Sequence, residues 1–344
     1  MGPSRRCLCL HLPDRWRQTE GQQGARSGAH RTSRSSFMSS SLTQVAPLVA
    51  SPRRALLGVA AALGAVLIWS CYFLSLRQGA LSPLGTLDLT LFRYAVPGLA
   101  LLPLALRRRQ RLLAVNPVWL VGMMAGAGIP FFLLGAVGMG LAPVAHGSTL
   151  IPGAAPLFVS TLAVWVFAQP LSRGRAAGLV AIGLGVVCLL ASGGQGLQSL
   201  LLGQGMFLLS SVMWAVFTLS VRQSGLSALE ATAVVTVPSG LVIVLTVIGL
   251  EASGAGGLSL HLVPTKEWLV QLVVQGILVG LGSGLLMGVA IRRLGAEATS
   301  ALGSLTPVAA TALAWWALDE TIGGVTAVGM LMVVSGVMIA SRGR

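Results

Sequence analysis

The chain has 344 residues, of which 54% are hydrophobic and only 9% are charged, with 23 Lys and Arg residues against 9 Asp and Glu residues. An ordinary soluble domain carries about 25% charged residues, so this composition argues against a soluble enzyme, a nucleic-acid-binding protein and a disordered chain. The formal net charge of +14 would point to nucleic acid only if the basic residues formed a patch, and they lie instead in short segments between apolar runs.

The first segment in chain order, residues 1–54, is rich in Arg, Ser, Gln and Gly and holds no long apolar run. Such a composition predicts a disordered basic tail. The short apolar stretch at residues 7–10 is followed closely by Pro13, so it does not form the core of a signal peptide. Met38 is an alternative to Met1 as the start of the native chain, and in that case residues 1–37 do not belong to the protein.

Ten apolar runs follow the tail, and each is close to the roughly 20 residues that a helix needs to span a bilayer. They are rich in Leu, Val, Ala and Gly, and the 44 glycines of the chain suit closely packed membrane helices. The sequence therefore predicts an all-α polytopic membrane protein with ten transmembrane helices. With boundaries good to a few residues, the runs are 55–76, 84–106, 117–138, 142–167, 175–192, 201–221, 228–250, 268–291, 296–318 and 323–340.

The basic residues predict the orientation of these spans. With the N-terminus in the cytoplasm, 20 of the 23 Lys and Arg residues fall in cytoplasmic segments, whereas the outer loops hold only Arg77 and Lys266. Arg93 alone falls within a span. Positively charged loops stay on the cytoplasmic side, so we expect both termini in the cytoplasm and a multi-pass protein of the bacterial inner (plasma) membrane.

The two halves of the membrane part repeat each other. Residues Trp69–Gln78 align with Trp214–Gln223 at an offset of 145, with identical Trp, Leu, Ser, Arg and Gln. Three later positions of the first half align with the second at an offset of 151: Pro156 with Pro307, Trp165 with Trp316, and Gln169 with Glu320. Each half holds five spans, and because five is odd the second copy enters the membrane upside down. We therefore expect two inverted five-helix repeats, 55–192 and 201–341, an organisation known from secondary transporters.

Several of these residues give the chain a family resemblance: a Trp in the first span, a Leu-Phe-Arg-Tyr sequence in the second, and a Pro-x8-Trp-x3-acid pattern before a Gly-rich last span. They are Trp69, Leu91, Phe92, Arg93, Tyr94, Pro307, Trp316, Glu320, Gly329 and Gly336. With the 5+5 duplication, they resemble the EamA type of the drug/metabolite transporter superfamily. The resemblance implies alternating-access export or exchange of metabolites, commonly amino acids or related small organic solutes. The chain departs from the pattern at Gln169, where the family has an acid.

Motifs of other function classes are missing from the sequence. It contains no GxxxxGK[ST], HExxH or GxSxG pattern, and its four Cys residues show no metal-ligand spacing. We therefore expect no enzyme activity, no catalytic residue, no cofactor and no metal. Because gene duplication also yields pores and scaffolds, a small-solute channel or an integral-membrane scaffold subunit is the alternative. A channel normally shows a ring of like charges, and Arg93 is the only clear charge inside a span.

Arg93 is a candidate coupling or gating residue. An ionisable group inside a membrane costs about 2.5–3.5 kcal/mol on insertion scales and marks a site by default. Its planar guanidinium group suits contact with an anion or a substrate carboxylate. The alternative is a structural arginine that bonds backbone carbonyls or Asp88, which lies five residues earlier.

One further pair lies at the repeat offset of 151. His146 and Glu297 are related by that offset and begin the fourth and ninth spans, and each is followed by a hydroxyl residue, Thr149 or Thr299. A histidine and a partly buried glutamate are reasonable proton-coupling groups, and the hydroxyl groups suit a cavity wall or a bond to a backbone carbonyl. The alternative is that both ionisable residues cap helix ends at the membrane interface.

Aromatic residues predict the remaining part of the site. Trp69 and Trp214 are repeat equivalents at the middle of two spans and suit opposite walls of a central pocket, to which Tyr72 and Phe131 add further rings. Packing in the core or against lipid is the alternative for each. Glu320 suits a gate at a helix end or a packing anchor, and its alternative is a solvated loop acid.

The sequence thus favours a secondary active transporter that exports a small organic metabolite by alternating access, driven by proton antiport or solute exchange. Its expected partners are the substrate and the lipid bilayer, not nucleic acid, and a homodimer is an open alternative. The expected substrate-binding residues are Trp69, Tyr72, Phe131, His146, Thr149, Trp214 and Thr299, and the expected coupling or gating residues are Arg93, Glu297 and Glu320.

Overall fold

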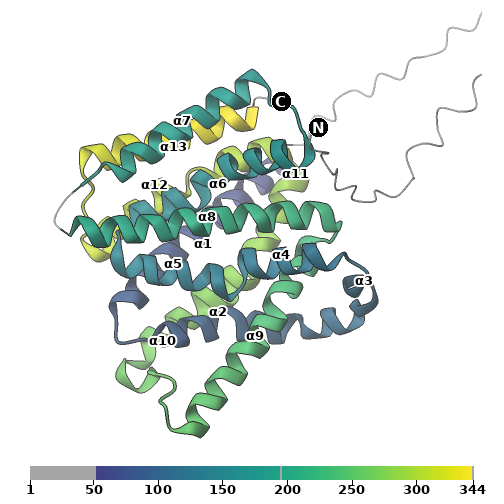
Figure 1. Cartoon of the computed structure of the whole chain (residues 1–344), viewed down its shortest axis with the longest axis vertical. Coiled ribbons are helices and arrows are strands. Elements are labelled where there is room, and N and C mark those ends of the chain that lie inside the picture. Colours follow the sequence, from purple (N-terminus) through teal and green to yellow (C-terminus); the bar gives the residue numbers. More distant parts are fainter. Residues whose placement is uncertain (1–51, 194–195, 343–344) are drawn as a thin grey trace, which may run out of the picture. The chain divides into compact units, whose positions relative to one another are not determined.

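The computed structural model describes residues 52–193 and 196–342, and every regular element in this part of the chain is a helix (Figure 1). Ten helical spans in it are long and apolar enough to cross a membrane, from Arg53–Leu81 to Gly324–Arg342. This confirms the ten spans and the all-α fold predicted from the sequence. The predicted tail up to residue 51, with the alternative start at Met38, lies outside the described residues.

The helices of the first half are α1 (Pro52–Leu81), α2 (Thr86–Arg107), α3 (Arg109–Leu113), α4 (Pro117–Ala127), α5 (Ile129–Leu141), α6 (Val144–Phe167) and α7 (Arg173–Leu190). Those of the second half are α8 (Leu197–Ser224), α9 (Ala228–Ser253), η1 (Leu260–Leu262), α10 (Thr265–Gln271), the π-helical segment η2 (Leu272–Gly282), α11 (Ser283–Gly303), α12 (Thr306–Leu318) and α13 (Gly324–Arg342). The short α3 and η1 lie in connections between spans.

Glycine and proline account for the interruptions within spans. The third span breaks between α4 and α5, where Gly128 is extended and Pro130 stands in the first turn of α5 without an N–H group to donate. The eighth span ends at Gly295, whose φ of 84° is a left-handed conformation that glycine adopts at little steric cost. Each break allows the chain to change direction within or at the end of an apolar run.

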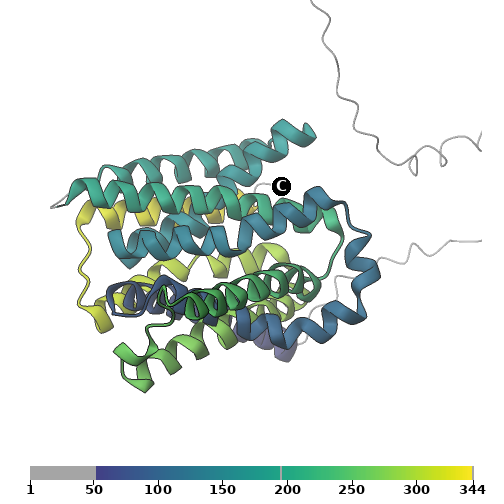
Figure 2. The same ribbon diagram turned by 60° about the horizontal axis from the view of Figure 1, so that its bottom comes forward.

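The packing of the helices repeats between the two halves. The equivalent helices α7 and α13 pack against each other, and so do the equivalent helices α2 and α9 (Figures 1 and 2). The contact of α6 with α8 has its equivalent in the contact of α12 with α1. The backbones of α7 and α13 approach so closely that a Cβ atom on Gly185 would lie 2.7 Å from the Gly329 carbonyl oxygen. The core is thus built largely from contacts between halves.

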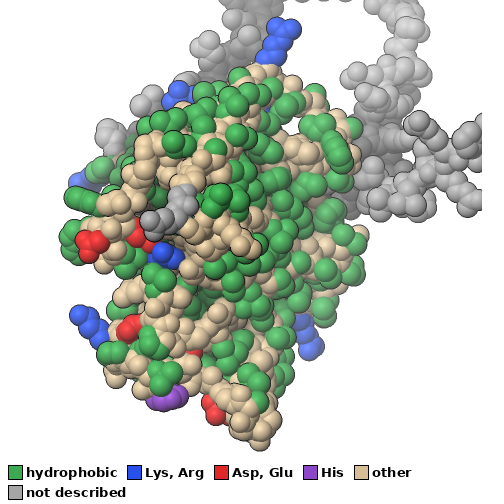
Figure 3. All heavy atoms as spheres, turned by 60° about the vertical axis from the view of Figure 1, so that its left-hand side comes forward, with side chains coloured by type: hydrophobic (Ala, Val, Ile, Leu, Met, Phe, Trp, Pro, Cys, Tyr) green, Lys and Arg blue, Asp and Glu red, His purple; other side chains and the backbone are tan. Residues whose placement is uncertain are grey.

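The outside of the bundle is apolar. Figure 3 shows hydrophobic side chains over most of the visible face, with few charged side chains among them. Large side chains such as those of Trp165 and Trp316 are exposed by 84% and 78%. Both lie near the ends of their spans, where tryptophan is typical of a membrane interface. This surface suits lipid rather than water.

Candidate functional site

Arg93 lies on α2, about 10 Å along the helix from its first residue at a rise of about 1.5 Å per residue. Its guanidinium carbon is 5.7 Å from the ring centre of Tyr72 on α1 and 5.8 Å from that of Tyr94 on its own helix. The Nε atom is buried and has no hydrogen-bond partner, although the side chain as a whole is partly exposed. The charge is therefore held between two aromatic rings.

The structure excludes Asp88 as the partner of Arg93. The Asp88 side chain is fully buried, and its carboxylate accepts hydrogen bonds from the backbone N–H groups of Gly85, at 2.9 Å, and of Ser259, at 3.0 Å. It thereby caps α2 and holds the connection after α9. The ion pairs shown among the described residues join other arginines to Glu320 and Glu230, and Arg93 takes part in neither.

Aromatic side chains from both halves of the chain lie in the same apolar core as the two tyrosines beside this arginine. Phe131 on α5 lies 5.6 Å, between ring centres, from Trp214 on α8. Its neighbour Phe132 packs edge to face with Tyr94, with 5.9 Å between the ring centres. The Tyr94 hydroxyl group donates to the Ala127 carbonyl oxygen at 2.8 Å. Trp214 in turn packs against Phe217, with 4.9 Å between the ring centres. We call this group, which consists of Tyr72, Tyr94, Phe131, Phe132, Trp214 and Phe217, the aromatic cluster.

Trp69 lies apart from these ring contacts. It is partly exposed on α1, and a Cβ atom on Gly303 would lie 4.0 Å from its ring. The structure thus brings three of the four predicted aromatic residues, Tyr72, Phe131 and Trp214, to the aromatic cluster and places the fourth near the end of α11. Tyr94 and Phe132 were not predicted as site residues. Their positions next to Arg93 and Phe131 in the sequence were the signal that could have identified them.

His146 is buried on α6 and pairs with Gln204 on α8, with 2.9 Å between His146 Nδ1 and Gln204 Nε2. The same amide nitrogen donates to the Leu189 carbonyl oxygen at 2.7 Å. Because an amide nitrogen only donates, Nδ1 accepts and the neutral ring carries its proton on Nε2. Sequence reasoning did not identify Gln204 as a partner, although a lone amide in the apolar run 201–221 was the available signal.

The other residues predicted with His146 are Thr149, Thr299 and Glu297, and none of them takes part in its contact with Gln204. Thr149 donates to the Ala145 carbonyl oxygen at 2.6 Å, and Thr299 donates to that of Gly295 at 2.7 Å. Both hydroxyl groups are therefore bonded to their own helices, the second of the two roles considered for them. Glu297 is exposed at the start of the ninth span and does not share the contact of His146 with Gln204.

Glu320 joins the two halves at the end of the bundle where α1 ends and α6 begins. Arg77 Nε on α1 donates to its Oε1 at 2.7 Å, and the backbone N–H of Val144 donates to Oε2 at 2.9 Å. Arg77 also donates to the Met139 carbonyl oxygen at the end of α5. The two charged side chains are each only 15% exposed, so Glu320 is not a solvated loop acid. We call this contact the Arg77–Glu320 bridge.

The repeat equivalents of the Arg77–Glu320 bridge do not form an ion pair. The helix end before Glu320 has the same form as the one before Gln169: the preceding residue has φ near +50° in both, and both backbone N–H groups donate six residues back at 3.3 Å. However, Gln169 is neutral, and both it and Arg222, the equivalent of Arg77, are exposed. The backbone geometry is repeated, and the charge is not.

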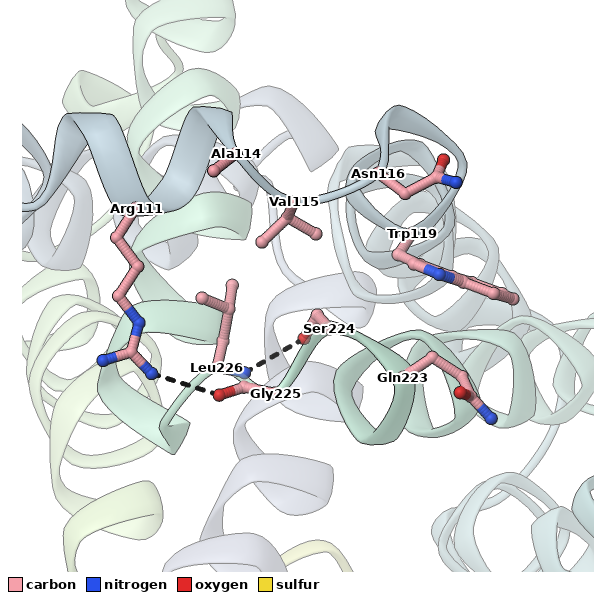
Figure 4. A pocket seen from close by; sticks show the side chains of 9 residues that line it. All are labelled: Arg111, Ala114, Val115, Asn116, Trp119, Gln223, Ser224, Gly225 and Leu226. Atoms are coloured by element: carbon pink, nitrogen blue, oxygen red, sulfur yellow. Dashed lines mark hydrogen bonds between the residues drawn. The ribbon is translucent and has the colours of Figure 1, made fainter. Parts of the chain in front are cut away.

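A hollow lies at this other end of the bundle, between the α3–α4 connection and the turn from α8 to α9 (Figure 4). Its volume is about 380 Å³. The Arg111 side chain crosses it, and Nη2 donates to the Gly225 carbonyl oxygen at 3.2 Å. Arg111 also lies 3.5 Å from Glu230. The residues that line the hollow are Arg111, Ala114, Val115, Asn116, Trp119, Gln223, Ser224, Gly225 and Leu226. None of the predicted site residues is among them.

Comparison with known proteins agrees with this architecture. The model of the EamA-like transporter family matches residues 56–191 and again residues 201–342. None of the curated proteins compared matches the chain. Among the solved structures that match, one titled "Crystal structure of protein" aligns with a TM-score of 0.54 at 20% identity, over 82% of this chain and 95% of that chain. At this identity the likeness shows the fold alone.

Proposed function

Because the chain belongs to the EamA-like transporter family of the drug/metabolite transporter superfamily, and is therefore a multi-pass membrane transporter, we propose that it is a secondary active transporter. It exports a small organic metabolite, such as an amino acid or a related solute, by alternating access. In this mechanism two halves rock about a central site, which opens to one side of the membrane at a time. We assign the central site to Arg93 and the aromatic cluster, because their residues come from both halves.

The orientation follows from the distribution of basic residues. In a bacterial plasma membrane, the bias of 20 of the 23 basic residues would place both termini and the Arg111 end of the bundle in the cytoplasm. The Arg77–Glu320 bridge then lies at the outer end. Five spans in each half also require the second repeat to have the opposite orientation. A topology reporter fused after Gly193 should report a location outside the cytoplasm, and one fused after Arg173 should report the cytoplasm. The reverse result would refute the orientation.

One observation carries the proposal of alternating access: the two ends of the bundle are closed unequally. At one end the Arg77–Glu320 bridge ties α12 of the second half to α1, α5 and α6 of the first. At the other end Arg222 and Gln169 are exposed, and a hollow of about 380 Å³ lies beside α8. This pattern fits a carrier that is closed on the outside and opens inward, with the bridge as its outer gate.

The contact between His146 and Gln204 supports proton coupling. It joins α6 of the first half to α8 of the second. Protonation of His146 would place an N–H group on Nδ1 opposite the donating amide of Gln204, so the contact would have to break or rearrange. A proton would thereby change the fit between the halves, which is what antiport requires. Glu297, exposed at the inner end in this orientation, remains a candidate gating residue.

Transport by the purified protein in proteoliposomes tests the proposal. The solutes for this assay are chosen by a growth screen, in which cells that overproduce the protein are exposed to toxic levels of amino acids, their analogues and cationic drugs. We expect flux of a protective solute that saturates with concentration and responds to an imposed pH gradient or to solute on the far side. His146→Gln should abolish the response to the pH gradient. Steady ion conductance without solute flux would instead support the channel, and absence of both would support the scaffold subunit.

A further inference from the structure

Arg93 is a positive charge without a negative partner in a part of the chain that lies inside a membrane. Such a charge is costly there, and membrane proteins normally offset it with an acid or with backbone carbonyls. Here the nearest acid in the sequence, Asp88, is used by the N–H groups of Gly85 and Ser259. The buried Nε of Arg93 has no hydrogen-bond partner at all. The site therefore has a missing acceptor.

The surroundings of Arg93 indicate what kind of acceptor fits. Tyr72 and Tyr94 lie within 6 Å of the guanidinium carbon, and the Tyr94 hydroxyl group is already bonded to Ala127. The other members of the aromatic cluster are Phe and Trp side chains, which present apolar faces. A guanidinium group binds a carboxylate through two parallel N–H···O bonds, which matches in shape and charge what is missing. An organic cation finds no acid in this group of residues.

From this arrangement we infer that Arg93 binds the carboxylate of the transported solute and that the substrate class is small organic acids, including amino acids, rather than organic cations. The apolar part of the solute lies against the aromatic cluster. This inference rests on the proposed function and specifies its substrate. It also gives the bound solute a role in the cycle, because a carboxylate on Arg93 neutralises the charge that the halves must close around.

Three probes with the same ring and arm length separate the chemistries: phenylacetate ends in a carboxylate, phenylacetamide in a neutral amide, and phenethylamine in an ammonium group. Binding to the purified full-length protein is measured by thermal shift and by quenching of tryptophan fluorescence. We expect phenylacetate to bind at least about tenfold more tightly than phenylacetamide, as befits a charge-assisted pair of hydrogen bonds. Phenethylamine should bind more weakly than either. This comparison needs no variant and so does not depend on whether a mutant folds.

Variants then assign the preference to one residue. Arg93→Gln should reduce the acid-to-amide ratio to less than about twofold, and Arg93→Lys, which keeps the charge without the planar fork, should retain part of it. Arg292→Gln is the matched control, since Arg292 is exposed on α11 and lies outside the aromatic cluster. A preference for phenethylamine, an acid-to-amide ratio unchanged by Arg93→Gln, or no binding of phenylacetate at millimolar concentration would each overturn the inference.

Failure of this inference is distinguishable from failure of the proposed function. If a solute from the growth screen is transported equally well by the native protein and by Arg93→Gln, the protein is a transporter and the assignment of Arg93 is wrong. If phenylacetate binds through Arg93 but no solute crosses the proteoliposome membrane, the anion site is right and the transporter proposal is wrong.

Discussion

Loss of the negative charge of Glu320 should open the outer end of the bundle. Glu320→Gln keeps one acceptor oxygen but removes the charge that holds Arg77 and the N–H of Val144 at 2.7 and 2.9 Å. A hydrogen bond to a charged group contributes about 1.5–3 kcal/mol, and breaking a well-buried ion pair costs about 3–5 kcal/mol. Because both side chains keep 15% exposure and one acceptor remains, about 2 kcal/mol is the expected loss.

That loss translates into a measurable population change. In the proposed mechanism the Arg77–Glu320 bridge exists only while the outer end is closed, so its full energy acts on the equilibrium between closed and open states. About 2 kcal/mol corresponds to about a 30-fold shift of this equilibrium. The cysteine variant Val144→Cys reports the shift, since Val144 is fully buried beside the bridge and becomes accessible when the end opens. A membrane-impermeant maleimide should alkylate it about 30-fold faster when Glu320→Gln is added.

The experiment uses a chain in which Cys7, Cys9, Cys71 and Cys188 are replaced by Ser, so that only the introduced thiol reacts. Asp319→Asn is the matched control: it removes the neighbouring acid, which is exposed, and asparagine tolerates the left-handed backbone at this position. The control should leave the alkylation rate within about twofold, as expected for a surface charge that makes little net contribution. An equal rate in Glu320→Gln and in its parent would refute the reasoning that the bridge closes the outer end.

Three further outcomes follow from the same structure. Gln169→Glu should give Arg222 the acidic partner that the other repeat has, stabilise closure of the inner end, and raise alkylation at the outer reporter several-fold. Gly185→Val should lower the melting temperature of the protein by several degrees, because its Cβ would lie 2.7 Å from a backbone oxygen of α13. Gly205 has open space around it, so the control Gly205→Val should leave the melting temperature unchanged. Tryptophan fluorescence follows melting in both variants. His146→Gln should bind phenylacetate with native affinity and lose only the dependence of solute flux on the pH gradient. A fall in phenylacetate affinity alongside the loss of pH dependence would contradict this prediction.

The sequence was sufficient for the spans because the membrane imposes a local rule. A helix that crosses it needs about 20 apolar residues wherever it packs, so composition alone predicts each span. The structure places the first span at Arg53–Leu81 where 55–76 was expected, and the ninth at Glu297–Leu318 where 296–318 was expected. What composition does not encode is the backbone between and within spans, such as the π-helical segment η2 in the eighth span.

The site was harder to predict because its contacts are not local. Arg77 and Glu320 are 243 residues apart, and a sequence read one span at a time treats both as loop charges. The five-residue spacing of Asp88 and Arg93 left their pairing open, and only the position of Ser259, in the connection after α9, shows where the Asp88 carboxylate is used. Thr149 satisfies its hydroxyl group within its own helix, as serine and threonine commonly do in apolar helices.

The chemistry proposed for this protein falls where the two repeats differ. When α2 and α9 are aligned at their first helical residues, the position of Arg93 is taken in the second half by Val235, a buried aliphatic side chain. The position of Glu320 is taken in the first half by Gln169, although the backbone around the two is the same. A symmetric pair of arginines would repel each other across one central site, and a symmetric pair of bridges would close both ends with equal strength. In the proposed mechanism the duplication supplies two halves able to rock against each other, the single charge of Arg93 defines one binding site, and the single bridge makes one end the more tightly closed.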